Sequence, residues 1–299
     1  MVATPEGKGA ISDAHYLSLG ALKTRVDPLR EHLATYDVIL AVGTRFATAN
    51  PVDGQRVVQI DVDPEEIGRN FKDTHGVVGD ARATLEALHD VLAGSMPARE
   101  SRQSEMEALK AERFGPAMRT EPQDSLLKAV RSALPDDGIL VAGMTQVGYY
   151  SRPFYPVYEP GTFLTSSYFG NLGYAYPVAL GAKVAQPERA VVAISGDGGF
   201  LYNSQELATA VQHGINAVVV VFNDNAYGNV LRDQMTRFDG RVIGAELHNP
   251  DFVRLAEAYG ARGVRAEGAD ALELALREAL AIEAPTLIEV PVGPMPSPF

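Results

Sequence analysis

Two aspartates follow two neighbouring apolar runs in the second half of the sequence. Gly196-Asp197-Gly198 comes after the run Ala190 to Ser195, and Asn223-Asp224-Asn225 comes after the run Ala217 to Phe222. Both runs have the length and composition of buried parallel strands, whose carboxyl ends meet at one edge of a sheet. Two carboxylates beside glycines and the free amides of a helix start suit a divalent cation bridged to a diphosphate.

A helix is needed between the two runs if they are to be parallel. The segment Asn203 to His213 has apolar residues at helical spacing on one face, and we expect Gly198-Gly199 and Gly214 to form the turns at its ends. The three residues GDG alone also fit a plain strand-to-helix turn. A nicotinamide-binding Rossmann site is a further alternative, but the glycines here do not have the GxGxxG spacing.

The order and spacing of these motifs resemble those of the thiamine-diphosphate enzymes, whose signature is GDG, about two dozen residues, and a pair of asparagines. Here 24 residues separate Gly198 from Asn223. The second asparagine is replaced by Asp224, which keeps an oxygen ligand and adds a negative charge. The resemblance implies that Mg²⁺ is bound by Asp197, Asp224 and the backbone carbonyl of Ala226.

A second segment, YFGNLGYAYP at Tyr168 to Pro177, resembles the part of this family that supports the aminopyrimidine of the cofactor. The resemblance implies a catalytic role for Leu172, as the bulky residue that bends thiamine diphosphate, and implies that the carbonyl of Gly170 accepts from the cofactor's amine. Periodicity alone favours Leu172 as an ordinary core residue. Further cofactor contacts implied by the resemblance come from Gly198, Gly199, Tyr227, Gly228, Thr145 and Gln146. For Thr145 and Gln146 the alternative is a polar surface turn.

The first 94 residues predict a second α/β region. Its segments GKGAIS, AVGTRF and IDVDPEEIGRN resemble the second half of the central domain in the acetolactate-synthase and pyruvate-oxidase group. We interpret Asp61 and Asp63 as caps of a following helix, with a contact to a ribose as the alternative. The expected elements are strands over Asp37 to Val42 and Arg56 to Val62, and helices over Pro64 to Asn70 and Ala81 to Leu92.

The predicted fold class is α/β: a partial Rossmann-like central domain over residues 1–94, a linker over 95–122 and a doubly wound, parallel-sheet diphosphate-binding domain over 123–299. The charge run in the linker favours a helix with a solvated face. The expected elements of the last domain, besides those above, are helices over SLLKAVRSAL, Pro250 to Tyr259 and Ala269 to Ile282, a helix ending the segment Thr162 to Ala185, and strands over GILVAG and Thr286 to Pro291.

Composition excludes several classes of function. The 299 residues carry a formal charge of -12, which argues against a general affinity for nucleic acid or anionic membranes. Without cysteine there is no disulfide framework or thiol nucleophile. No apolar run has the length of a signal peptide core or a membrane span, so we expect a cytoplasmic protein.

The resemblance implies a lyase or transferase that uses thiamine diphosphate and Mg²⁺ to decarboxylate a 2-keto acid or to join it to a second carbonyl compound, as acetolactate synthases do. No segment resembles the pyrimidine-binding domain that carries the activating glutamate in the family. We therefore expect the chain to be inactive alone and to require a pyrimidine-domain polypeptide or homo-oligomer. The alternative is a noncatalytic cofactor-binding module or a truncated remnant. FAD stays open as a second cofactor, since AVGTRF alone does not decide it.

Overall fold

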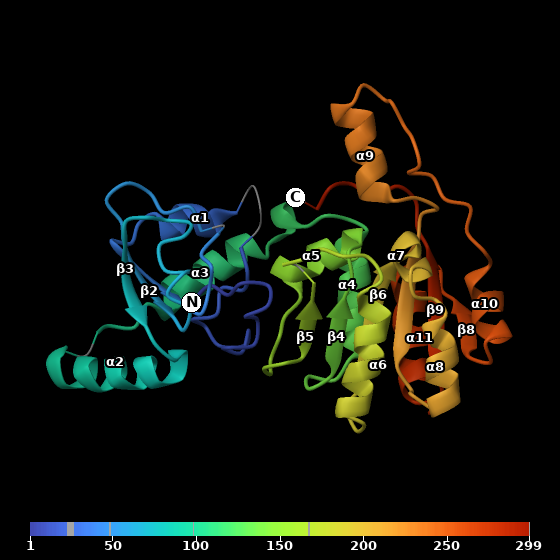
Figure 1. Ribbon diagram of the computed structural model, residues 1–299, viewed down its shortest axis with the longest axis horizontal. Helices are drawn as coiled ribbons and strands as arrows, with labels where there is room; N and C mark the ends of the chain where they lie inside the picture. The colour runs from blue at the N-terminus through green and yellow to red at the C-terminus, as the bar shows by residue number, and fades with distance from the viewer. Residues whose placement is uncertain (23–26, 48, 98, 167, 299) are drawn as a thin grey trace. The chain divides into compact units, whose positions relative to one another are not determined.

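The protein forms two compact units in a computed structural model that describes residues 1–22, 27–47, 49–97, 99–166 and 168–298 (Figure 1). The smaller unit is Leu22–Gly115, and the larger unit is Met1–Ala21 together with Pro116–Phe299. Both contain parallel sheets, which confirms the predicted α/β class. This division reflects where the chain is compact and does not test domain boundaries. The boundaries expected at residues 94 and 122 stay a prediction.

The smaller unit contains a three-stranded parallel sheet in the order β1-β2-β3. Asp27 caps the first helix and forms a buried ion pair with Arg113, at 2.9 Å between Oδ1 and Nε. The predicted solvated face of the charge run is therefore wrong for Arg113, because its charge is neutralised inside this unit. The elements are α1 (Pro28–Leu33), β1 (Val38–Val42), β2 (Arg56–Asp61), β3 (Thr74–Val78), α2 (Ala81–Ser95) and α3 (Gln103–Arg113).

The helix expected over Pro64 to Asn70 does not form, and the segment is a series of turns. The side chain of Gln59 forms hydrogen bonds with backbone groups of this segment. Its Nε2 donates to the carbonyl of Glu66 at 3.1 Å, and its Oε1 accepts from the amide of Gly68 at 2.9 Å. Asp61 and Asp63 each accept from the amide two residues onward, at 3.0 and 2.9 Å. These side-chain bonds replace the helical ones, so the two acids cap turns rather than a helix.

The larger unit contains a six-stranded sheet in the order β5-β4-β6-β7-β9-β8, with every pair parallel. This is the doubly wound arrangement that the apolar runs predicted. Its strands are β4 (Ile139–Ala142), β5 (Phe163–Thr165), β6 (Val191–Gly196), β7 (Val218–Asn223), β8 (Arg262–Arg265) and β9 (Thr286–Pro291). Its helices are η1 (Pro116–Met118), α4 (Gln123–Ala133), α5 (Gln146–Phe154), α6 (Ala175–Ala185), α7 (Asp197–Leu201), α8 (Glu206–His213), α9 (Gly228–Arg237), α10 (Phe252–Ala258) and α11 (Gly268–Leu280).

Helices cover both faces of this sheet (Figure 1). Alternate residues of each central strand enter opposite cores: Val192 and Ile194 pack with α4, α5 and α11, whereas Val191 and Ala193 pack with α6, α8 and α10. Burial on both faces explains why the central strands are continuous apolar runs, since neither face needs polar side chains.

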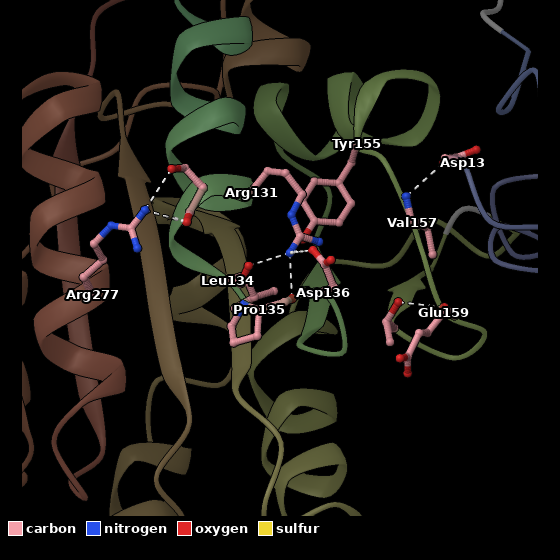
Figure 2. Close-up of polar contacts among 11 residues, drawn as sticks. Asp13, Arg131, Leu134, Pro135, Asp136, Tyr155, Val157, Glu159 and Arg277 are labelled. Atoms are coloured by element: carbon pink, nitrogen blue, oxygen red, sulfur yellow. Dashed lines mark hydrogen bonds and ion pairs between the residues drawn. The ribbon is translucent and has the colours of Figure 1, made fainter. Parts of the chain in front are cut away.

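Arginines hold the end of α4 in place (Figure 2). Arg131 donates to the carbonyls of Leu134 and Pro135, at 2.5 and 2.6 Å, and to the Tyr155 hydroxyl at 3.0 Å. These bonds satisfy carbonyls that a helix end leaves free. The N-terminal segment belongs to the same unit, where Asp13 accepts from the amide of Val157 at 2.8 Å.

The predicted turn at Gly198-Gly199 is wrong, because both glycines lie inside the short helix α7, which begins at Asp197 directly after β6. The chain enters this helix without a loop, so the amides of its first turn stay at the carboxyl edge of the sheet. Among the described residues, no helix is both long and apolar enough to cross a membrane.

Candidate functional site

The strand order reverses beside β4, since β5 lies on one side of it and β6 on the other. In open α/β sheets such a switch point leaves a crevice at the carboxyl ends of the strands. Thr145 follows β4, and Asp197 follows β6. A Cβ atom added to Gly196 would lie 3.4 Å from Thr145 Oγ1, so these two strand ends are in contact distance. Asp224, the residue after β7, completes the row.

Asp197 is 1% exposed and is held from several sides. Its Oδ1 accepts from the amide of Gly198 at 2.8 Å, and its Oδ2 accepts from Asn249 Nδ2 at 2.6 Å. Burial raises the pKa of Asp197 above its ordinary value, while hydrogen bonds from Gly198, Asn249 and the amides of Ala226 and Asn225 act in the opposite direction. The carboxylate is therefore fixed in orientation and costly to keep ionised without a positive partner.

Asp224 lies close enough to Asp197 for the two charges to repel. Burial, and after it the charge of Asp197, raises the pKa of Asp224 to about 6, and the amide of Ala226 acts in the opposite direction. A half-buried carboxylate whose proton affinity is raised by a buried carboxylate beside it is the electrostatic condition that a divalent cation relieves. The sequence-based expectation that both strand ends deliver an acid to one place is consistent with this geometry.

Glycines let the loops approach each other closely at this edge. A Cβ atom on Gly198 would lie 2.4 Å from the Tyr227 ring, and one on Gly228 would lie 2.5 Å from Asp224 Oδ2. Tyr227 therefore packs directly over the start of α7, and α9 begins against the Asp224 carboxylate. Ala226 is buried and pairs with the returning chain through a bridge to Glu246. The predicted residues of the two loops thus lie together.

The segment before α6 also reaches this edge. A Cβ atom on Gly199 would lie 3.6 Å from Leu172 Cδ2, so Leu172 is half-buried beside α7. Gly170 has a φ of 72°, a conformation that favours glycine, and it is exposed. Tyr176 is buried in the core instead, packed on Phe200 at 5.8 Å between ring centroids. Leu172 therefore lies near the carboxyl edge of the sheet and not in the hydrophobic core that α6 helps to form.

Thr145 and Gln146 are buried, at 8% and 7% exposed, which argues against the alternative of a polar surface turn. Gln146 is the first residue of α5, and its Oε1 accepts from Arg232 of α9 at 3.3 Å. Its Nε2 would lie 3.9 Å from a Cβ atom on Gly228. The loop after β4 therefore contacts the loop after β7.

Sequence reasoning missed a group of polar residues behind the two acids. Asn249 bonds to Asp197, and Glu289 of β9 bonds to Asn223, at 2.8 Å between Oε1 and Nδ2. Arg265 of β8 neutralises Glu289, at 2.8 Å between NH2 and Oε2. The available signal was the acid inside the otherwise apolar strand TLIEVP, because an acid at a buried strand position requires a partner.

The protein side chains at this edge supply only some of the oxygen ligands that a hard cation needs. No cluster of three or more His, Cys, Asp and Glu side chains that could hold a metal ion occurs among the described residues. Asp197 and Asp224 are two carboxylates, so a cation here requires further oxygen ligands such as the Ala226 carbonyl and phosphate, which suits the few protein ligands that Mg²⁺ takes. Asn249 Oδ1 is buried and has no hydrogen-bond partner among the described residues. The site thus offers carboxylates, an acceptor and helix-start amides to a bound group.

Comparison with known proteins gives two family matches. The model "Thiamine pyrophosphate enzyme, C-terminal TPP binding domain" matches residues 143–290, and the model of the central domain of the same enzymes matches residues 1–88. A probable 2-ketoarginine decarboxylase from Pseudomonas aeruginosa is 33% identical over 95% of this chain and 52% of its own length. An acetolactate synthase large subunit, isozyme 3, from Escherichia coli is 32% identical over 94% of this chain and 52% of its own. The chain spans about half the length of these curated relatives.

Proposed function

The chain belongs to the thiamine pyrophosphate enzyme family, and we propose that the carboxyl edge of its six-stranded sheet binds this cofactor together with Mg²⁺. Thiamine pyrophosphate is another name for thiamine diphosphate. The observation that carries this proposal is the placement of the buried Asp197 and the half-buried Asp224, two acids with raised pKa values, beside the sheet's switch point. A divalent cation between them and a diphosphate would remove the repulsion. The amides at the start of α7 favour the diphosphate oxygens.

Each predicted residue receives a role from its position. Asp197, Asp224 and the carbonyl of Ala226 would ligate the cation. Gly199 would present its amide to the diphosphate, and Gly198, whose amide already donates to Asp197, would let the diphosphate approach closely. Thr145, Gln146, Tyr227 and Gly228 would line the diphosphate from the neighbouring loops. Leu172 and the Gly170 carbonyl would hold the rest of the cofactor in a bent shape. When bound, thiamine diphosphate supplies an electron sink for breaking the bond next to a keto carbon.

We further propose that the complete enzyme acts on a 2-keto acid by decarboxylation or carboligation. The support is the similarity to acetolactate synthases and to a probable 2-ketoarginine decarboxylase. Because the relatives are about twice as long, the activity should require a pyrimidine-binding part that these 299 residues do not resemble and that is contributed from outside them. A noncatalytic cofactor-binding role is the second candidate, since the two acids and the loops around them could hold the cofactor without catalysing a reaction on it.

Calorimetric titration of the chain with thiamine diphosphate, with and without Mg²⁺, tests the binding proposal. Asp197→Ala removes one hard ligand and Asp224→Ala removes the other. Each is expected to weaken Mg²⁺-dependent binding by at least about tenfold, as loss of ordered groups around a metal commonly does. His213→Ala, at the other end of α8, is the matched control and should bind like the parent. A folded Asp197→Ala variant that binds as tightly as the parent would contradict the assignment.

A further inference from the structure

A chain of polar side chains crosses the carboxyl ends of four strands in the larger unit. Asn249 Nδ2 donates to Asp197 Oδ2 at 2.6 Å and to Asn223 Oδ1 at 2.8 Å. Asn223 Nδ2 donates to Glu289 Oε1 at 2.8 Å, and the Nε atom of Arg265 donates to Glu289 Oε2 at 3.0 Å. The chain therefore runs from the end of β6 over β7 and β9 to the edge strand β8.

The charges at the two ends determine how the two amides between them are oriented. Glu289 is 4% exposed, and its carboxylate oxygens accept from Arg265 and from Asn223, which turns its NH₂ group toward Glu289. Asn223 Oδ1 then faces Asn249, whose NH₂ group has one hydrogen for Asn223 and one for Asp197. A flip of either amide would place two donors or two acceptors against each other. Glu289, together with the Asn225 amide that donates to Asn223 Oδ1 at 3.2 Å, thus favours the orientation that directs a donor at Asp197.

The main chain around Asn249 is fixed as well. The returning segment pairs with the loop after β7, since the amide of Tyr227 donates to the carbonyl of Ala245 and the amide of Leu247 donates to the carbonyl of Asn225, both at 2.8 Å. Two residues after Asn249, Asp251 caps α10 and accepts from Arg265 at 3.2 Å. Asn249 therefore sits between two anchored points, and its side chain has little freedom to move away from Asp197.

We infer that Asn249 is a positioning residue of the cation site, and that Glu289 and Arg265 set its orientation through Asn223. The inference rests on the proposed function, because it concerns the carboxylate of Asp197 as a metal ligand. Asn249 holds Oδ2 of that carboxylate while the Gly198 amide holds Oδ1, so the plane of the group is fixed before any cation arrives. A ligand held by an outer hydrogen bond loses less freedom on binding a metal.

The test measures cation binding directly with Mn²⁺ and thiamine diphosphate on the 299-residue chain. Asn249→Ala removes both donors, and Asn249→Asp places a third carboxylate against Asp197. Asn249→Ala is expected to raise the dissociation constant of Mn²⁺ by about 10- to 100-fold, the range found for outer-shell groups of metal sites. The Mn²⁺ electron paramagnetic resonance spectrum should also broaden, since the remaining ligand has more than one orientation. Asn216→Ala, just before β7 at the opposite edge of the sheet, is the matched control.

A merely structural role would lower the melting temperature and the number of binding sites but leave the dissociation constant of the folded fraction unchanged. That result would overturn the inference. If the parent protein itself fails to bind Mn²⁺ with thiamine diphosphate, the proposed function falls and the inference falls with it. If the parent binds and Asn249→Ala binds equally, only the inference falls.

The isosteric variant Glu289→Gln tests the remote part of the chain and serves as a second measurement if Asn249→Ala does not fold. Its neutral amide can turn either group toward Asn223, so residue 289 no longer favours one orientation of Asn223. The Asn225 amide and Asp197 still favour the original orientations. We expect a smaller loss of Mn²⁺ affinity in the same direction, and no additional loss when Glu289→Gln is combined with Asn249→Ala. Fully additive losses would show that Glu289 does not act through Asn249.

Discussion

Asp224 stands where the family motif has an asparagine, so two acids lie at this edge and repel each other. Burial and the charge of Asp197 raise the pKa of Asp224 to about 6. We therefore expect the protonation of Asp224 to differ between the protein without a cation and the protein with one. An asparagine at this position would carry no charge. The second carboxylate therefore makes the site more dependent on a cation at neutral pH than a site with one acid.

The raised pKa of Asp224 predicts an unusual pH dependence of stability in EDTA. The folded protein holds a proton that the unfolded chain, with an ordinary aspartate pKa of about 3.9, has lost. The contribution of this group to stability is present below that value and is lost as the pH rises through about 6, the folded pKa. The melting temperature of the parent should therefore fall over this interval relative to that of Asp224→Asn.

Differential scanning fluorimetry of both proteins across the pH series measures this difference. Added Mg²⁺ and thiamine diphosphate should reverse the order at neutral pH, because only the parent has both carboxylates for the cation. Parallel melting curves for parent and variant in EDTA would contradict the predicted interaction between the two acids.

The packing of α10 on β8 positions the segment that carries Asn249. Gly263 of β8 lies directly under α10: a Cβ atom there would be 2.5 Å from the carbonyl oxygen of Val253 and 2.9 Å from its Cα. These are backbone atoms, which cannot rotate away as a side chain does. The absence of a side chain at Gly263 therefore sets the distance between the edge strand and the helix that follows Asp251.

Gly263→Ala is expected to destabilise the larger unit by about 1–3 kcal/mol, the range for forcing a methyl group into a packed interior. Gly181→Ala in α6 is the matched control, since no atom lies within 4 Å of its added Cβ. That control should be neutral or more stable by up to about 1 kcal/mol, because alanine suits a helix interior better than glycine. Urea titrations followed by circular dichroism measure both. Equal midpoints for the two variants would show that α10 adjusts freely on β8.

In the chain as a whole, exposed apolar side chains lie beside the sheet edge that we propose as the cofactor site. Phe169 is 82% exposed, next to the segment that carries Gly170 and Leu172. Tyr176, which the sequence grouped with this apolar segment, is buried and does not contribute to such a surface. An exposed aromatic residue beside the proposed binding site supports the proposal that a further protein surface covers this edge.

The isolated chain is expected to show little decarboxylase or carboligase activity with saturating thiamine diphosphate and Mg²⁺. Glu206, the acid at the start of α8, accepts from the Thr209 hydroxyl at 2.8 Å on its own helix, and we do not expect it to activate the cofactor. Without the acid-base assistance of the activating glutamate, the catalytic rate should be lower by about 10²–10⁴-fold. Exchange of the C2 proton of bound cofactor, followed by NMR, measures this step without a substrate.

Slow exchange that is restored by a pyrimidine-domain protein would support a divided enzyme. Slow exchange that no such protein restores would favour the noncatalytic module. Exchange as fast as in a complete relative would contradict the expectation that these 299 residues are inactive alone.

Local sequence was sufficient for the central strands and for the two acids. Strands β6, β7 and β9 are buried on both faces, so their apolar runs mark them without any tertiary information. The GDG and NDN motifs at their ends could be placed together because parallel strands joined by a helix share an edge. Short strands such as β8, with the sequence RGVR, have no such run and exist only because β9 pairs with them.

Tertiary packing was needed for everything that connects residues far apart in the chain. Whether Thr145 is buried depends on β4 lying next to β6, and the partner of Asp197 comes from Asn249, 52 residues away. Glu289 reaches Asn223 because β9 is inserted between β7 and β8, although it follows both in the sequence. Strand order and register depend on the packing of many helices at once, so no local pattern encodes them, and a hydrogen-bonded chain across four strands becomes visible only once the sheet is assembled.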